Sequence, residues 1–149
     1  MRWNPHVTVA TVVSREEQFL CVKEHSRKGE VINQPAGHWE KGETLIEAAQ
    51  RETLEETGWH VSISHLISVY QWQHPEKDET FLRFCFAANC LEHEPTRELD
   101  PAIISVCWLS YKQLLDARPA WRSPMVLRCI DDFISGRNHS LDLFESVLN

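Results

Sequence analysis

The chain has 149 residues, of which 42% are hydrophobic and 25% are charged, which is the composition of an ordinary globular domain. We therefore treat residues 1–149 as one domain. Fifteen Lys and Arg residues against 22 Asp and Glu residues give a net charge of −7, which argues against a surface built to bind nucleic acid. No stretch approaches the ~20 apolar residues of a membrane span, and the first residues lack the pattern of a signal peptide. We expect a cytoplasmic protein that is independent of membranes.

The cysteines support the same expectation. The chain has five of them, an odd number, and no two stand in a C-x-x-C pair. Most lie in apolar runs, which favours reduced thiols in the core over disulfides or a zinc site. The five residues are Cys21, Cys85, Cys90, Cys107 and Cys129.

The first part of the chain alternates strand-like and polar segments. The β-branched run at residues 7–13 predicts a strand, and residues 19–22 predict a second strand after a turn at residues 14–17. Residues 23–42 are polar and contain three glycines and a proline, so we expect a long loop there.

The rest of the chain continues with a helix over residues 45–57. Residues 59–72 predict one or two strands, and residues 80–88 and 103–109 predict one strand each, with an acidic loop at residues 92–101. Residues 111–115 and 124–134 have helical patterns, and residues 137–149 carry no signal. This order predicts an α/β fold in which helices pack on a mixed sheet.

The helix over residues 45–57 has clear boundaries. Thr44 can cap its first turn, Glu47 can complete a capping box, and Gly58 suits the left-handed residue that follows a helix. One face of the helix is apolar and is expected to pack on the sheet. Its members are Leu45, Ile46, Ala49 and Thr53.

Three glutamates crowd the last two turns of this helix. Glu52, Glu55 and Glu56 fall within an arc of roughly 100°, where neighbours three and four residues apart repel each other. The negative end of the helix dipole disfavours them further. Ala48 projects into the same arc and leaves room above the carboxylates. The cluster is either a solvated acidic surface or a site for a hard divalent cation.

The spacing of the surrounding residues decides between these two interpretations. Seven residues stand in the order G-x5-E-x7-R-E-x2-E-E-x-G, which arises by chance roughly once in 10⁸–10⁹ starting points. This pattern resembles the signature of the Nudix hydrolases. Thr53 and Trp59 depart from it at packing positions. The signature residues are Gly37, Glu43, Arg51, Glu52, Glu55, Glu56 and Gly58.

Shorter segments extend the resemblance over most of the chain. The runs HVTVA at residues 6–10, QPAGH at 34–38, QW at 71–72, FLRF at 81–84 and RSP at 122–124 together resemble the NudJ phosphatase branch of the family. The resemblance implies an α/β/α sandwich around a mixed β-sheet. It also implies a hydrolase that uses Mg²⁺ or Mn²⁺ to cleave a diphosphate linked to another group.

The resemblance also implies roles for individual residues. Glu52 and Glu56 are the expected metal ligands, and Glu55 is either a further ligand or orients the attacking water. The backbone carbonyl of Gly37 is another expected ligand. Arg51 and Glu43 are expected to join the loop to the helix through a charge-assisted hydrogen bond.

The general base and the substrate contacts are less defined. The family often takes the base from a loop across the site, and this chain has Ile103, Ile104 and Ser105 where acids are frequent. For the phosphates we favour Lys23, at a strand end, over Arg27 and Lys28. Trp72 could either stack on a ring of the substrate or pack in the core. The loop acids that are candidates for the base are Glu76, Asp78, Glu79, Glu92, Glu94, Glu98 and Asp100.

These observations predict a Mg²⁺-dependent phosphohydrolase, with Mn²⁺ as a substitute. Its expected substrates are nucleoside di- and triphosphates and related organic pyrophosphates, including hydroxymethylpyrimidine or thiamine pyrophosphate. The alternatives are a dinucleoside-polyphosphate or nucleotide-sugar pyrophosphatase, a non-catalytic nucleotide-sensing domain, and an acidic protein-interaction domain. The expected partners are small phosphorylated molecules, and the chain is expected to be a monomer or a homodimer.

Overall fold

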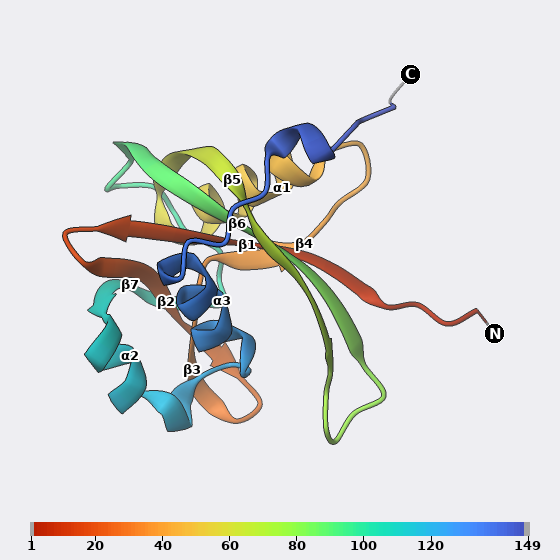
Figure 1. The fold of residues 1–149 in the computed structure, drawn as a ribbon. Helices are drawn as coiled ribbons and strands as arrows, with labels where there is room; N and C mark the ends of the chain where they lie inside the picture. The colour runs from red at the N-terminus through yellow and green to blue at the C-terminus, as the bar shows by residue number, and fades with distance from the viewer. Residues whose placement is uncertain (1, 148–149) are drawn as a thin grey trace.

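The computed structural model describes residues 2–147 (Figure 1). The elements in chain order are β1 (His6–Arg15), β2 (Gln18–Ser26), β3 (Gly29–Asn33), β4 (Ala36–His38), α1 (Leu45–Thr57), β5 (Trp59–Gln73), β6 (Thr80–His93), β7 (Ile103–Ser110), α2 (Tyr111–Asp116), the 3₁₀ helix η1 (Arg118–Ala120), α3 (Met125–Ile134) and the 3₁₀ helix η2 (Leu141–Leu143). No helix in residues 2–147 has the length and apolar character needed to cross a membrane.

The strands form the mixed sheet that the sequence predicts. β1 pairs parallel with β6 and antiparallel with β4, and β5 pairs antiparallel with β6. β2 lies antiparallel between β3 and β7. These three strands connect to β1 and its neighbours through the antiparallel pairing of β1 with β2 next to their tight turn. Glu16 and Glu17 occupy that turn with φ of 51° and 63°, the left-handed backbone that tight hairpins require.

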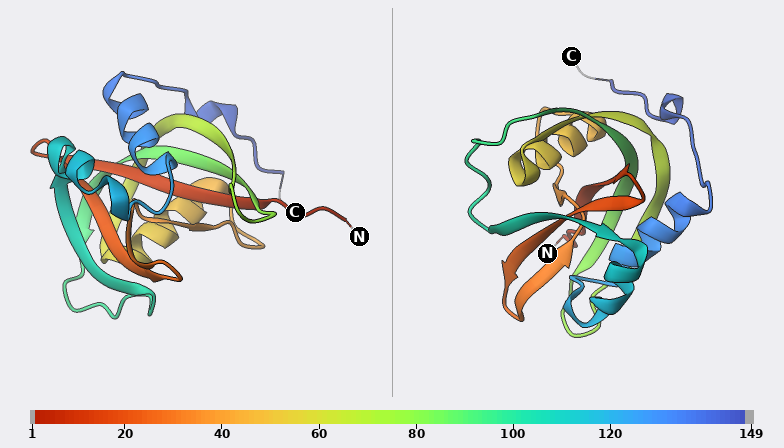
Figure 2. Two further views of the ribbon diagram at one scale, coloured as in Figure 1. Left: turned by 90° about the horizontal axis from the view of Figure 1, so that it is seen from below. Right: turned by 90° about the vertical axis from the view of Figure 1, so that its left-hand side faces the viewer.

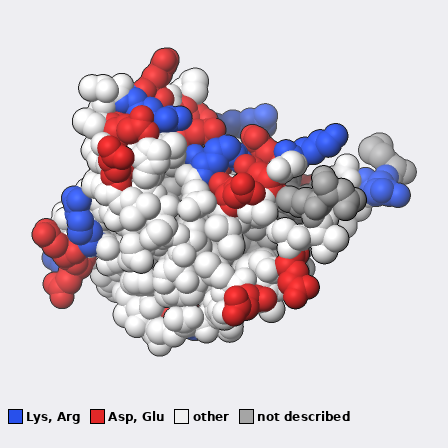
Figure 3. Space-filling view, turned by 90° about the horizontal axis from the view of Figure 1, so that it is seen from above, with Lys and Arg blue, Asp and Glu red and all other residues white. Residues whose placement is uncertain are grey.

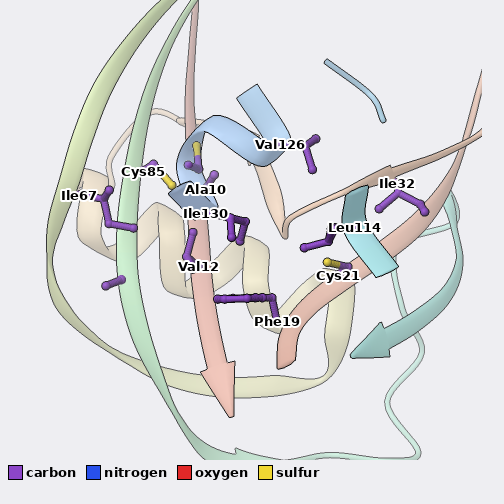
Figure 4. Close-up of a cluster of buried hydrophobic side chains, with 12 residues drawn as sticks. Ala10, Val12, Phe19, Cys21, Ile32, Ile67, Cys85, Leu114, Val126 and Ile130 are labelled. Carbon is purple, nitrogen blue, oxygen red and sulfur yellow. The ribbon is translucent and has the colours of Figure 1, made fainter. Parts of the chain in front are cut away.

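Helices cover both faces of the sheet, which confirms the expected α/β/α sandwich. The right-hand view of Figure 2 shows α1 on one side of the strands and α3 on the other. Successive side chains of β1 point to opposite faces of the sheet, because side chains alternate along a strand. Val9 packs with Ala48 and Ala49 of α1, whereas Ala10 belongs to the cluster that contains Val126 of α3 (Figure 4).

The loop predicted for residues 23–42 is wrong. β2 continues to Ser26, and β3 and β4 occupy much of the remaining segment. Val31 and Ile32 form a buried centre for β3, and Gly29 closes the β2–β3 turn with a φ of 104°. Polar side chains on the exposed edge of this hairpin conceal its strand pattern.

The helix prediction is confirmed in its boundaries and its caps. α1 spans Leu45–Thr57, Thr44 and Glu47 form the capping box, and Gly58 adopts a φ of 77°. The room expected beside Ala48 is absent, because Ala48 is fully buried in the core. The buried arc of α1 is wider than the apolar residues alone indicate, since the helix lies deep against β1 and β5.

Thr53 departs from the family pattern because it forms a buried polar contact. Its hydroxyl lies 2.8 Å from the hydroxyl of Thr11 in β1 and donates to the backbone carbonyl of Ala49 at 2.7 Å. Two hydroxyls at this interface satisfy each other, so the helix docks on the sheet without leaving a buried polar group unpaired.

The last described residues close the core on the α1 side. His139 exchanges backbone hydrogen bonds with Leu66 of β5 at 2.9 and 3.0 Å. The ring of Phe144 then lies 5.6 Å from that of Phe86 and 6.0 Å from that of Phe84, measured between centroids. This segment, which carries no signal in the sequence, therefore stabilises the helix that bears the glutamates.

Candidate functional site

Arg51 is the centre of the hydrogen-bond network around α1. Its guanidinium donates two hydrogen bonds to the carboxylate of Glu43, at 2.8 and 2.7 Å, and one to the backbone carbonyl of His38 at 3.0 Å. It also donates to Glu52 at 2.8 Å and to Glu55 at 3.2 Å. The paired hydrogen bonds fix the β4–α1 loop to the helix and hold the pKa of Glu43 below its ordinary value.

Glu52 lies directly over the backbone of Gly37 in β4. A Cβ atom on Gly37 would overlap the Glu52 carboxyl group, so only glycine allows this approach. Burial raises the pKa of Glu52, and the hydrogen bond from Arg51 opposes that rise. The Gly37 backbone and a carboxylate therefore share one small region, as the signature implied.

Glu56 is the most deeply buried carboxyl group of the helix, with 7% of its surface exposed. It accepts one hydrogen bond, from the backbone N–H of Ala36 at 2.9 Å. Burial raises its pKa to about 9, and the nearby carboxylates of Glu24, Glu52 and Asp100 add to the effect. No cation among the described residues compensates this acid directly.

Glu24 is an acid of the site that the sequence reasoning missed. It lies on β2, is buried, accepts a hydrogen bond from the Asn33 amide at 3.3 Å and pairs with Arg122 at 3.4 Å. Strand alternation could have revealed it, because Leu20, Val22 and Glu24 share one face of β2. The predicted strand ends at Val22, so this alternation was not extended.

These groups meet at one cavity of about 620 Å³. Its acidic end contains carboxylates from α1 and β2, and its other walls carry cations and aromatic rings. The acidic residues lining it are Glu24, Glu40, Glu52, Glu56, Glu79 and Asp100. The cationic and aromatic residues are Arg27, Lys28, Lys77, Arg83, Arg122, Trp72 and Phe81.

The predicted site residues fall into three groups. Gly37, Glu52, Glu56 and Trp72 line the cavity, and Glu43 and Arg51 support it from the side of the α1 N-terminus and loop. The side chain of Glu55 is 40% exposed and bonds to Arg51, and Glu55 is not among the residues that line the cavity. The structure therefore brings Glu52 and Glu56 together at one opening and leaves Glu55 outside its lining.

Lys23 requires a correction. It is exposed on β2 and does not line the cavity, because alternation turns it away on the strand where Glu24 turns in. Arg27 and Lys28, which follow at the end of the same strand, line the cavity instead.

Among the loop acids considered as bases, Asp100 is directly attached to the helix. Its backbone N–H donates to the Glu55 carbonyl at 2.9 Å, and its side chain lines the cavity. Glu94 instead pairs with His60 and Arg97. Glu79 also lines the cavity, from the β5–β6 turn.

The donor set of the acidic end fits a hard divalent cation. Glu24, Glu52 and Glu56 offer carboxylate oxygens, the ligands that Mg²⁺ prefers, and the absence of a side chain on Gly37 lets the Glu52 carboxyl group lie against the backbone of β4. A cation would also compensate the charge that burial disfavours on Glu56. Within residues 2–147 no three His, Cys, Asp or Glu side chains already converge as a metal-binding group, so ion binding requires these carboxylates to turn.

Comparison with known proteins agrees with this description. The NUDIX domain family matches residues 4–129. Phosphatase NudJ of Escherichia coli strain K12 is 43% identical over 141 residues, which cover 95% of this chain and 91% of that protein. A NUDIX hydrolase structure from Nitrosomonas europaea superimposes with a TM-score of 0.94 at 36% identity, covering 96% of this chain and 97% of that one.

A more distant structure shares the fold. It is a bifunctional NMN adenylyltransferase/ADP ribose pyrophosphatase from Francisella tularensis, complexed with AMP and a Mn ion, with a TM-score of 0.63 and 17% identity. The alignment covers 89% of this chain and 42% of that one. Together with the geometry of the signature residues, the family match and the similarity to NudJ establish that the chain is an enzyme of the Nudix hydrolase family.

Proposed function

We propose that the chain is a Mg²⁺-dependent phosphohydrolase that cleaves nucleoside di- and triphosphates and related organic pyrophosphates. The observation that carries this proposal is the buried, uncompensated Glu56 carboxyl group near Glu52 and Glu24, in a cavity that is also lined by arginines and lysines. Such a cavity suits a cation and a polyphosphate together. The similarity to a protein named phosphatase NudJ supports the same chemistry.

The signature residues have proposed roles. Glu52 and Glu56, with the Gly37 carbonyl, would hold the metal, and Glu55 would either add a ligand or orient the attacking water. When bound, a divalent ion offsets the charge of the phosphate oxygens and lowers the pKa of a water molecule. Mn²⁺ is the expected substitute, because the carboxylate donors suit both ions. Arg51 and Glu43 keep the carboxylates in place.

Asp100 is the proposed acceptor of the proton from the attacking water. Its carboxylate accepts a hydrogen bond from the backbone N–H of Ala102 at 2.9 Å, which holds the side chain on the wall of the cavity. An Asp100→Asn variant keeps this shape but cannot take a proton. We expect turnover to fall by about 10²–10⁴-fold.

Trp72 is the proposed contact for a ring of the substrate. It lies on β5 beside Phe81, with the ring centroids 5.6 Å apart, and both rings line the cavity. Arg27 and Lys28 replace Lys23 as the proposed phosphate contacts of the β2 end. A pyrimidine or purine ring near Trp72 would place the phosphates towards the carboxylates.

The decisive experiment is a panel of phosphorylated metabolites assayed with and without Mg²⁺, with the products identified. Release of orthophosphate indicates terminal cleavage, and a nucleoside monophosphate indicates internal cleavage. A Glu55→Gln, Glu56→Gln double variant should lose nearly all turnover while remaining folded. Glu98→Gln is the matched control, because Glu98 is exposed and does not line the cavity. Undiminished turnover by the double variant would exclude this site.

A neighbouring hollow favours a larger substrate as the second candidate. This hollow of about 380 Å³ adjoins the cavity and shares Lys28, Trp72 and Arg122 with it. Arg118 and Trp121 line its far side. A dinucleoside polyphosphate or a nucleotide sugar would fill both spaces, and internal cleavage in the product analysis would identify it.

We propose a cytoplasmic location and a monomeric or homodimeric state. The cysteines of the described residues are free thiols, as expected in a reducing compartment. On the face drawn in Figure 3, charged side chains of both signs gather mainly towards the rim, and a broad central area is uncharged. The mixed signs on this face and the net charge of −7 do not suit nucleic acid. Light scattering of the purified protein tests the oligomeric state.

A further inference from the structure

Arg83 occupies an unusual position for an arginine. It lies in the middle of β6, between Thr8 of β1 and Tyr70 of β5, at the floor of the cavity. Only 4% of its surface is exposed, and it is the one buried arginine among residues 2–147. The phosphohydrolase function proposed for the chain assigns it no role.

None of the partners of the Arg83 guanidinium is a carboxylate. It donates to the side-chain oxygens of Gln34 and Asn33, each at 3.2 Å, and to the sulfur of Cys129 at 3.7 Å. Within the described part of the chain it forms no ion pair with a carboxylate. Its positive charge is therefore buried without a carboxylate beside it, an arrangement that costs desolvation free energy.

The guanidinium also has unused hydrogen-bonding capacity. The Nε–H group of Arg83 is buried and has no acceptor among residues 2–147. A guanidinium carries more N–H donors than its three observed acceptors use. A buried donor without a partner is rare and is generally explained by a function, such as a ligand that supplies the acceptor.

We propose that Arg83 binds a phosphate oxygen of the substrate. A phosphate group supplies both missing features, the negative charge and an acceptor for the free donor, and arginine is well suited to bind it. Asn33 connects the two ends of the cavity, because its amide nitrogen donates to Glu24 while its oxygen accepts from Arg83. A substrate with linked phosphates can therefore contact Arg83 and the carboxylate end at once.

This inference rests on the proposed phosphohydrolase function and adds a residue that selects the anion. The other cations of the cavity differ from Arg83. Arg122 already pairs with Glu24. Arg27, Lys28 and Lys77 lie at the protein surface, so their charges are screened by solvent. Arg83 alone offers a buried charge to a buried phosphate group.

A thiolate at Cys129 is the competing partner for this charge. Burial opposes ionisation of Cys129, but a hydrogen bond from Cys85 and the charge of Arg83 outweigh it and lower the pKa to about 7. If this thiolate neutralised Arg83, the guanidinium would not need a substrate anion. The two assignments predict different behaviour towards pyrophosphate.

The test compares Arg83→Met with Arg128→Met, which removes an arginine that is 69% exposed in its side chain and lies outside the cavity. Inorganic pyrophosphate in EDTA is the probe, measured by calorimetry. We expect Arg83→Met to weaken binding by about 10- to 100-fold, which is the usual contribution of a charge-assisted hydrogen bond. Arg128→Met should leave this affinity unchanged.

A measurement on the unaltered chain covers the case in which Arg83→Met fails to fold. The arginine side-chain N–H resonance of Arg83 should shift on addition of pyrophosphate. An unshifted resonance, or unchanged affinity in Arg83→Met, would overturn the inference in favour of a structural role. A thiolate absorbance lost in Arg83→Met, with unchanged pyrophosphate affinity, would assign the charge to Cys129.

The failure of this inference can be told apart from failure of the proposed function. The Glu55→Gln, Glu56→Gln variant should keep its metal-free affinity for pyrophosphate while losing turnover. If the unaltered protein hydrolyses no phosphorylated compound but binds pyrophosphate through Arg83, the anion site stands and the proposed function does not. If turnover is normal and Arg83→Met binds pyrophosphate as tightly as the unaltered protein, the proposed function stands and the anion site does not.

Discussion

Replacing Glu56 with Gln should stabilise the metal-free protein at neutral pH. The carboxyl group of Glu56 is buried, and its pKa rises from 4.5 to about 9 on folding. Between these two values the folded chain holds a proton that the unfolded chain has released. The contribution of Glu56 to stability is therefore fully present below pH 4.5 and is lost as the pH rises towards 9.

The size of the effect follows from the same pKa values. At about pH 7.5, the unfolded-state value of 4.5 lies about three units below the pH, and each unit corresponds to about 1.4 kcal/mol. The upper limit of the gain for Glu56→Gln is thus about 4 kcal/mol. The substituted glutamine would avoid the penalty, because an amide does not ionise and its oxygen can still accept from the Ala36 N–H.

Chemical denaturation in EDTA at about pH 5 and about pH 7.5 measures this difference. The advantage of Glu56→Gln should be small at the lower pH and should grow by several kcal/mol at the higher one. Glu55→Gln is the matched control, because its half-exposed side chain should change stability by less than about 1 kcal/mol at either pH. Adding Mg²⁺ should stabilise the unaltered protein more than Glu56→Gln. An advantage that stays constant between the two pH values would refute the argument from burial.

Three further substitutions test the supports of the site. Gly37→Ala should displace the Glu52 carboxyl group and lower turnover by at least about tenfold. Gly136→Ala meets open space, so its φ of 86° should lower stability while turnover stays unchanged. Arg51→Lys cannot reproduce the paired hydrogen bonds to Glu43, so thermal unfolding should show a loss of about 1–3 kcal/mol together with lower activity. Phe144→Ala should destabilise the protein by about 2–4 kcal/mol with unchanged KM, while exposed Leu143→Ala should have little effect; equal losses for both would argue against the packing of this segment.

The helix and its carboxylates were predictable because their determinants are local. Caps, helical spacing and the signature all lie within residues 37–58, and the structure reproduces α1 to the residue. The strands β1 and β7 were also predictable, because their residues form short β-branched and apolar runs in the sequence. Ala48 was misplaced because helical periodicity gives the direction of a side chain but not the depth to which the helix is buried.

The residues that were missed depend on contacts between distant parts of the chain. The polar stretch over β2 and β3 becomes a hairpin through pairing, and only that pairing shows that Glu24 turns inwards and Lys23 outwards. Arg83 stands out only when Gln34, Asn33 and Cys129 are seen around it, because the run FLRF does not reveal that its arginine is buried without an ion pair.

The position of Phe144 has a consequence for folding during synthesis. Val9 and Ala48 can meet as soon as β1 and α1 have left the ribosome, but their hydrophobic cluster stays open until Leu141 and Phe144 arrive. A nascent chain that already contains every glutamate of the site would still expose the apolar surface that Leu141 and Phe144 cover. Synthesis of the segment that carries Leu141 and Phe144, rather than completion of the signature, is therefore the step that closes this hydrophobic cluster.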